Sequence, residues 1–134
     1  MTRDKSELFK KGDAVRLELL GEERYRRNNA AYYESPIMGE FLDVVTETVF
    51  GGLWARPGLD LKTRTLICVI SDVALGCEPE LAIHLRFALG QGWTREELTE
   101  ALLQLMGYVG VPLVRGALTV AKAVFAEIDA EQGR

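Results

Sequence analysis

The sequence predicts an all-α fold, and the spacing of its apolar residues is the main reason. These residues recur every three or four positions along most of the 134 residues, which is the period of helices packed on a core. No segment alternates apolar and polar side chains for long enough to indicate a strand. Glycines and prolines divide the pattern into six or seven helical segments. Since the length is that of one ordinary domain, we expect a single domain over residues 1–134.

Composition and charge exclude several classes of protein. Hydrophobic residues make up 48% of the chain and charged residues 27%, as in ordinary globular proteins. The net charge is −4, and the basic residues are interleaved with acids, so we expect no nucleic-acid partner. The apolar runs are shorter than the roughly 20 residues of a membrane span. No charged-then-apolar leader opens the sequence, so we expect a cytoplasmic protein with no membrane partner.

The first half of the chain is expected to form three helices and a loop. Gly21 separates the first helix from the second. Ser35 and Pro36 are a good start signal for the third, because serine caps free N–H groups and proline fits the first turn. The expected helices are residues 3–20, 22–33 and 36–51, followed by a loop at 53–59.

The second half is expected to hold the buried core. The segment 61–75 is apolar almost all round, so it is predicted to be the buried central helix. Pro79 and Pro112 fit the first turns of two further helices. Thr94 and Glu97 match the capping box, in which each side chain accepts a free N–H group of the other residue's backbone. These signals predict a helix between the two that begin at the prolines.

His84 is the only histidine and leads the candidates for chemistry. It lies on or beside the apolar face set by Leu81 and Leu85, so one interpretation is a core histidine with satisfied ring nitrogens. The other rests on Glu80, which precedes it by one helical turn. A carboxylate at that position can bond one ring nitrogen and leave the other free for proton transfer.

The two cysteines have different surroundings. Cys68 stands among apolar residues and is interpreted as a small buried hydrophobic side chain. Cys77 stands at a helix joint, two turns before His84, where it can flank a ligand or act as a reactive thiol. One histidine and two separated cysteines do not form a zinc set, so we expect no metal site.

Four larger side chains are candidates for substrate binding. Arg64 and Arg86 can each grip a carboxylate through paired hydrogen bonds. Alternatively, Arg64 forms an ion pair with a nearby aspartate and Arg86 faces solvent. Trp54 can contact a ligand, pack within its loop or meet a neighbouring subunit. Tyr108 can offer its hydroxyl to a pocket or lie in the core.

A set of short motifs stands in a fixed order along the chain. Together they resemble the carboxymuconolactone decarboxylase family, and a further likeness at residues 15–21 extends the match to nearly the whole sequence. Each motif alone has little specificity, whereas the ordered set is specific. The motifs are Trp54-x-Arg56-Pro57-Gly58-Leu59, Arg64-Thr65-Leu66, Glu80-Leu81-x-x-His84-x-Arg86-x-Ala88-Leu89-x-x-Gly92, Thr94-x-Glu96-Glu97 and Tyr108-x-Gly110-Val111-Pro112.

The resemblance implies a fold, an assembly and an activity. The fold is that of the alkylhydroperoxidase D proteins, assembled as a trimer or hexamer. The activity is cofactor-independent decarboxylation of a small anionic substrate, typified by conversion of 4-carboxymuconolactone to 3-oxoadipate enol-lactone and CO2 in protocatechuate (β-ketoadipate) breakdown. His84 would transfer the proton and Glu80 would orient it. The residues expected to bind substrate are Arg64, Arg86, Cys77, Trp54 and Tyr108.

Three alternatives remain at the level of sequence. The peroxidase branch of the superfamily uses a Cys-x-x-Cys pair, and here Glu80 replaces the second cysteine, so a thiol-dependent antioxidant using Cys77 ranks below decarboxylation. Gly52 and residues 113–115 depart from the family pattern, which would suit a paralogue acting on a different small lactone or acid. In the third alternative, a non-catalytic helical assembly, His84 is part of the core.

Overall fold

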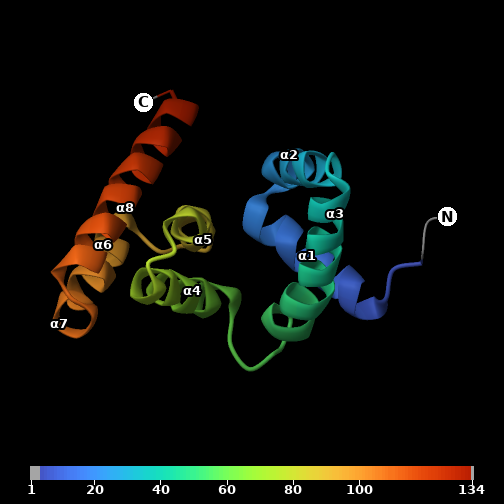
Figure 1. The fold of residues 1–134 in the computed structure, drawn as a ribbon, viewed down its shortest axis with the longest axis horizontal. Coiled ribbons are helices and arrows are strands. Elements are labelled where there is room, and N and C mark those ends of the chain that lie inside the picture. The colour runs from blue at the N-terminus through green and yellow to red at the C-terminus, as the bar shows by residue number, and fades with distance from the viewer. Residues whose placement is uncertain (1–3, 134) are drawn as a thin grey trace. The chain divides into compact units, whose positions relative to one another are not determined.

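The computed structural model describes residues 4–133, and its secondary structure there is helical with no strand (Figure 1). The predicted all-α class is confirmed. The chain divides after Asp60 into two compact units, each with its own packing. Within the described residues no helix is both long and apolar enough to cross a lipid bilayer.

The first unit is organised around a very close contact between two helices. Its elements are α1 (Glu7–Leu20), α2 (Glu22–Tyr33), α3 (Pro36–Val45) and the π-helix η1 (Thr46–Trp54), which continues α3 and lies along α1. A Cβ atom added to Gly12 would lie 2.0 Å from the carbonyl oxygen of Thr46, and one added to Gly51 would lie 2.1 Å from that of Leu8. Only glycine permits backbones to approach so closely.

A buried arginine joins α1 to α2. The Arg16 side chain donates a hydrogen bond to Oδ1 of Asn28 at 2.8 Å, pairs with Asp13 at 3.6 Å and lies over the ring of Tyr25. Burial lowers the pKa of the Arg16 guanidinium, while Asp13 acts in the opposite direction. The cation is stabilised by these contacts, since an unpaired buried charge would be costly.

The predicted helices of this unit are present, although residues 4–6, expected within the first helix, are not helical and α1 begins at Glu7. The helix at 22–33 has the predicted bounds, and Pro36 lies in the first turn of α3. The predicted loop at 53–59 is wrong at its start, because Leu53 and Trp54 belong to η1. A π-helix bonds residue i to i+5 and has no pattern of its own in the sequence.

The second unit encloses a continuous apolar core. Leu81, Leu85 and Ala88 of one helix meet Leu98 and Leu102 of another in this core. Each residue of that group has almost no exposed surface. The elements are α4 (Leu61–Leu75), α5 (Glu78–Gly90), α6 (Arg95–Gln104), α7 (Met106–Val109) and α8 (Val111–Glu131).

The central helix α4 has the predicted bounds but is buried on one face only. Val69 and Val73 lie in the core, whereas Ile67 and Leu75 are exposed, Leu75 to 73%. Within its own unit, this predicted buried helix is therefore covered on one face and exposed on the other. The capping box of Thr94 and Glu97 at the start of α6 is confirmed, with both of its hydrogen bonds formed at 3.0 Å.

Candidate active site

The joint between α4 and α5 sets the geometry of the site. Gly76 adopts φ 69°, a conformation that side chains disfavour, and turns the chain at the end of α4. The backbone N–H of Cys77 then donates to the carbonyl oxygen of Asp72 at 2.8 Å. Pro79 stands in the first turn of α5, where its missing N–H is not needed. The second half of α4 therefore lies against α5.

The joint brings His84 of α5 to Asp72 of α4. Nδ1 of His84 lies 2.5 Å from Oδ2 of Asp72, and the two side chains are only 21% and 10% exposed. The ring of Phe87 packs beside the imidazole, tilted by 58° with 5.7 Å between the ring centroids. A carboxylate at Nδ1 fixes the tautomer with the proton on that nitrogen. Nε2 is then the nitrogen that can meet a reactant.

The surroundings of Asp72 raise the pKa of its carboxyl group. Burial raises the pKa of Asp72, the hydrogen bond and charge of His84 lower it, and the negative charge of Glu80 raises it again. The net effect is a pKa above the usual value of 3.8. His84 is therefore the contact that favours the ionised form of this buried acid.

The predicted hydrogen bond between Glu80 and His84 is not formed in the described part of the chain. Asp72 occupies Nδ1 instead, and the Glu80 side chain is exposed to solvent. Glu80 acts on the pair only through its charge, which disfavours ionisation of Asp72. The orienting contact thus comes from the neighbouring helix and not from the previous turn of α5. A direct part for Glu80 in substrate chemistry stays a prediction.

Arg64, Cys68 and Asp72 stand four residues apart along α4 and so share one side of that helix. Burial raises the pKa of the Cys68 thiol to about 11, and the charge of Asp72 contributes to this shift. Cys68 is therefore held as the neutral thiol at neutral pH, which agrees with the interpretation as a small hydrophobic side chain. Arg64 is half-buried near the start of the helix.

Cys77 is the N-cap residue of α5 and is half-buried. Its Sγ lies 4.0 Å from the carbonyl oxygen of Leu75, and neither Cys77 nor Cys68 is in a disulfide. Over residues 4–133, no group of three or more histidine, cysteine or acidic side chains is placed to hold a metal ion.

Arg86 is paired with two carboxylates of α8, and its role as a clamp for substrate stays a prediction. It donates hydrogen bonds to Glu131 at 3.0 and 3.1 Å and to Glu127 at 3.1 Å, which tie α5 to α8. Burial alone would lower the pKa of Arg86, but these two carboxylates raise it above its usual value. Both groups would have to be displaced before Arg86 could bind a substrate carboxylate.

The two aromatic candidates have opposite environments. Trp54 ends η1 in the first unit, where it is buried and stacks on Phe50 at 5.7 Å between centroids. This agrees with the packing interpretation of Trp54, although the residue is in a helix and not in a loop. Tyr108 in α7 is 79% exposed, so its interpretation as a core tyrosine is wrong. Substrate binding by either residue stays a prediction.

Comparison with known proteins decides the family. Residues 39–123 match the sequence profile of the Carboxymuconolactone decarboxylase family, which is more than half of the chain. The chain belongs to this family. The resemblance inferred from the short motifs is thereby confirmed.

Two curated relatives of this chain carry the names of decarboxylases. The 4-carboxymuconolactone decarboxylase of Acinetobacter baylyi is 34% identical over 90% of this chain and 88% of its own length. The nitrosuccinic acid decarboxylase npaB of Metarhizium robertsii is 34% identical over 86% of this chain and 79% of its own length. An uncharacterised 15.0 kDa protein of Paracoccus denitrificans is 38% identical over 63% of this chain and 65% of its own length. The names support a lyase of the decarboxylase type.

Within this member of the carboxymuconolactone decarboxylase family, sequence reasoning missed Asp72 as the partner of His84. One signal was present, since Asp72 is the only charged residue within the apolar run from Leu66 to Leu75. A charge there requires a partner when the helix packs on a core. The spacing of the sequence gave no means of naming that partner, because it lies on another helix.

Proposed function

We propose that this protein is a cofactor-independent decarboxylase acting on a small acid such as 4-carboxymuconolactone. The observation that carries the proposal is the Asp72–His84 pair, in which a carboxylate holds Nδ1 of a partly buried imidazole and no hydrogen bond within the described residues occupies Nε2. Membership of the family and the names of two relatives point to the same class of reaction. The β-ketoadipate pathway is the expected setting.

The proposed decarboxylation requires the protein to stabilise negative charge and to transfer one proton. Loss of CO2 breaks a carbon–carbon bond, and its electron pair moves through the adjacent double bond into the lactone carbonyl. The resulting dienolate takes a proton at carbon from Nε2 of His84. Asp72 accepts the Nδ1–H hydrogen bond and so stabilises the imidazolium that delivers the proton. Solvent then returns a proton to His84 after the product leaves.

Arg64 is the arginine that we propose as the clamp for the substrate carboxylate. It stands on the same side of α4 as Asp72 and precedes it by eight residues. This separation is about two helical turns, or about 12 Å along the helix axis. Arg86, the other predicted clamp, pairs with Glu127 and Glu131 of α8. Cys77, Trp54 and Tyr108 remain proposed contacts to the substrate.

The decisive experiment is an ultraviolet assay with freshly generated 4-carboxymuconolactone. We expect turnover by the wild-type protein and a loss of roughly 100-fold or more in His84→Ala, the usual contribution of a general acid. Circular dichroism of the variant reports whether the fold is retained. A folded His84→Ala variant with full activity would overturn the mechanism. Lack of turnover by the wild-type protein would exclude this substrate, and a parallel assay with nitrosuccinate then tests the substrate named for the second relative.

We also propose that the protein assembles as a homo-oligomer, a trimer or hexamer. Several large apolar side chains on α3 and α4 are exposed, which is unusual for a protein that acts as a monomer. On α3, Ile37, Phe41 and Val44 are spaced to share one face and are all more than half exposed. Burial of such faces against copies of the same chain would supply the apolar contacts that each chain lacks alone.

A further inference from the structure

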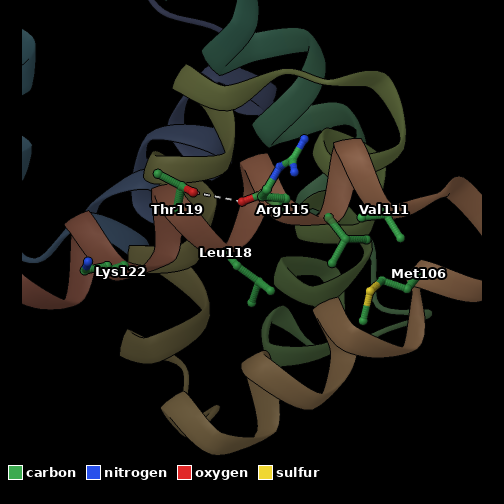
Figure 2. A pocket seen from close by; sticks show the side chains of 7 residues that line it. Met106, Val111, Arg115, Leu118, Thr119 and Lys122 are labelled. Atoms are coloured by element: carbon green, nitrogen blue, oxygen red, sulfur yellow. Dashed lines mark hydrogen bonds between the residues drawn. The ribbon is translucent and has the colours of Figure 1, made fainter.

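A groove on α8 lies outside the proposed active site. It has a volume of about 290 Å³ and is lined by side chains of α7 and α8. In Figure 2, Leu118 lies between Lys122 on one side and Val111 and Met106 on the other. Thr119 turns its hydroxyl toward the backbone and donates to the carbonyl oxygen of Arg115 at 2.9 Å, so its methyl group is left for the groove.

The groove and the Asp72–His84 pair lie on opposite sides of the contact between α5 and α8. α8 meets α5 along the face that holds Gly116 and Glu127, as the contacts of Glu78 and Arg86 show. At 100° per residue, Leu118 and Lys122 lie on the far side of α8 from that face. The same geometry places His84 on the side of α5 away from α8. The groove is therefore a separate feature.

Two cations lie at an otherwise apolar surface. Among the described residues, no carboxylate lies within ion-pair distance of Arg115 or Lys122. By contrast, Arg86 and Arg95 of the same unit are both paired with acids of α8. Arg115 and Lys122 stand seven residues apart, two turns along one face and about 10 Å by helix rise. Between them lies Leu118, with Met106 and Val111 toward one end.

We propose that this groove binds a medium-chain aliphatic carboxylate. The apolar body of the ligand would lie against Met106, Val111 and Leu118, and its carboxylate would pair with Arg115 or Lys122. We choose an acid because Arg115 and Lys122 are cationic and attract a carboxylate. An apolar groove without these two charges would not prefer an acid to a neutral or a basic ligand. An acetate ion has the carboxylate but almost no alkyl chain. An alkylamine has the alkyl chain but carries a positive charge. Each should therefore bind less well.

The test uses octanoate as the probe with the full-length protein, below the concentration at which octanoate self-associates. Shift changes in ¹H–¹⁵N correlation spectra should saturate and concentrate at residues 106–122. Acetate should bind at least about tenfold more weakly, since it lacks most of the apolar chain. Octylamine should also bind more weakly than octanoate, because its positive charge is repelled by Arg115 and Lys122.

Variants identify the groups responsible. Arg115→Gln and Lys122→Gln should each weaken octanoate binding by roughly two- to fivefold, the range for exposed ion pairs. Met106→Glu, at an exposed position, should weaken it further by repulsion. Lys11→Gln on α1 is the matched control and should leave affinity unchanged. Absence of saturable shifts, equal binding of octylamine, or unchanged affinity in the double Arg115→Gln/Lys122→Gln variant would each overturn the proposal.

Discussion

The position of a single carboxylate decides how His84 is oriented. Glu80 is one turn away along α5 and its spacing favours contact, yet Asp72, twelve residues away, occupies Nδ1. The difference is one of burial, because an exposed glutamate is already solvated whereas an acid within a packed helix interface gains from a partner. The spacing of residues in the sequence identifies neighbours on one helix. The partner of His84 lies on another helix, α4, and the joint between α4 and α5 brings the two residues together.

The first prediction separates the two acids. Asp72→Asn should lower kcat of the proposed decarboxylation by roughly 100-fold or more with a smaller effect on KM, because the neutral amide stabilises the imidazolium poorly. Glu80→Gln, the matched control, should change kcat by less than that. Steady-state kinetics on both variants measure the effect. A larger loss of kcat in Glu80→Gln than in Asp72→Asn would return the orienting role to Glu80.

The second prediction concerns pH. The pKa of Asp72 is raised, so its carboxylate is lost on acidification at a higher pH than in an ordinary aspartate. The acid limb of kcat/KM should therefore lie above the pH at which a free aspartate titrates, and Asp72→Asn should lack this limb. An acid limb that is unchanged in Asp72→Asn would assign it to another group.

The same raised pKa has the opposite sign for stability. Since the folded state holds the proton on Asp72 more tightly than the unfolded state does, this group contributes stability below its unfolded pKa. That contribution is lost as the pH rises through its folded pKa. Over the window between the two pKa values, acidification should thus lower activity while the part of the unfolding free energy due to Asp72 increases. Denaturant unfolding of wild type and Asp72→Asn across this window measures it.

At the scale of elements, signals that act over a few residues were sufficient to predict most helix boundaries. The capping box at Thr94 and the bounds of α2 and α4 were predicted correctly, because caps, glycine breaks and apolar spacing are local. The π-helix η1 was not predicted. Its register accompanies the close approach of Gly51 to α1, a contact with residues more than forty positions earlier.

The third prediction tests that contact. Gly12→Ala should destabilise the protein by about 3 kcal/mol, because the new methyl group would meet backbone atoms of Thr46 and Gly51 that cannot move aside easily. Gly52→Ala is the control on η1, since its Cβ would be in ordinary contact with the carbonyl oxygen of Glu47 at 3.9 Å. It should stay within about 1 kcal/mol of wild type. Urea unfolding distinguishes the two, and equal stability of both variants would contradict the close packing.

At the scale of the whole molecule, apolar patterning overestimated what one chain buries. α4 is apolar almost all round, but within its own unit only the face with Val69 and Val73 is covered. Periodicity shows that a helix has two apolar faces and leaves open whether the second meets the same chain or another copy. The all-α class was predictable because it depends on periodicity alone, whereas the contacts of each face depend on tertiary packing.

The fourth prediction concerns assembly. The double variant Ile37→Glu/Val44→Glu places two charges on the exposed face of α3 and should shift the protein to a smaller mass. Glu40→Gln on the same helix is the control and should leave the mass unchanged. Light scattering coupled to size-exclusion chromatography measures both. A wild-type protein that is monomeric at micromolar concentration would contradict the proposed oligomer.

The backbone hydrogen bond from Cys77 to Asp72 has a consequence for folding kinetics. The proposed catalytic pair is closed by a short stretch of chain, twelve residues from Asp72 to His84, so little loop entropy opposes its formation. The pair can then form as soon as the α4–α5 hairpin does, ahead of contacts that are more distant in sequence. The Cys77 amide proton lies inside this hairpin, and its exchange rate with solvent reports how often the hairpin opens. A single amide signal can thus monitor the integrity of the site without substrate.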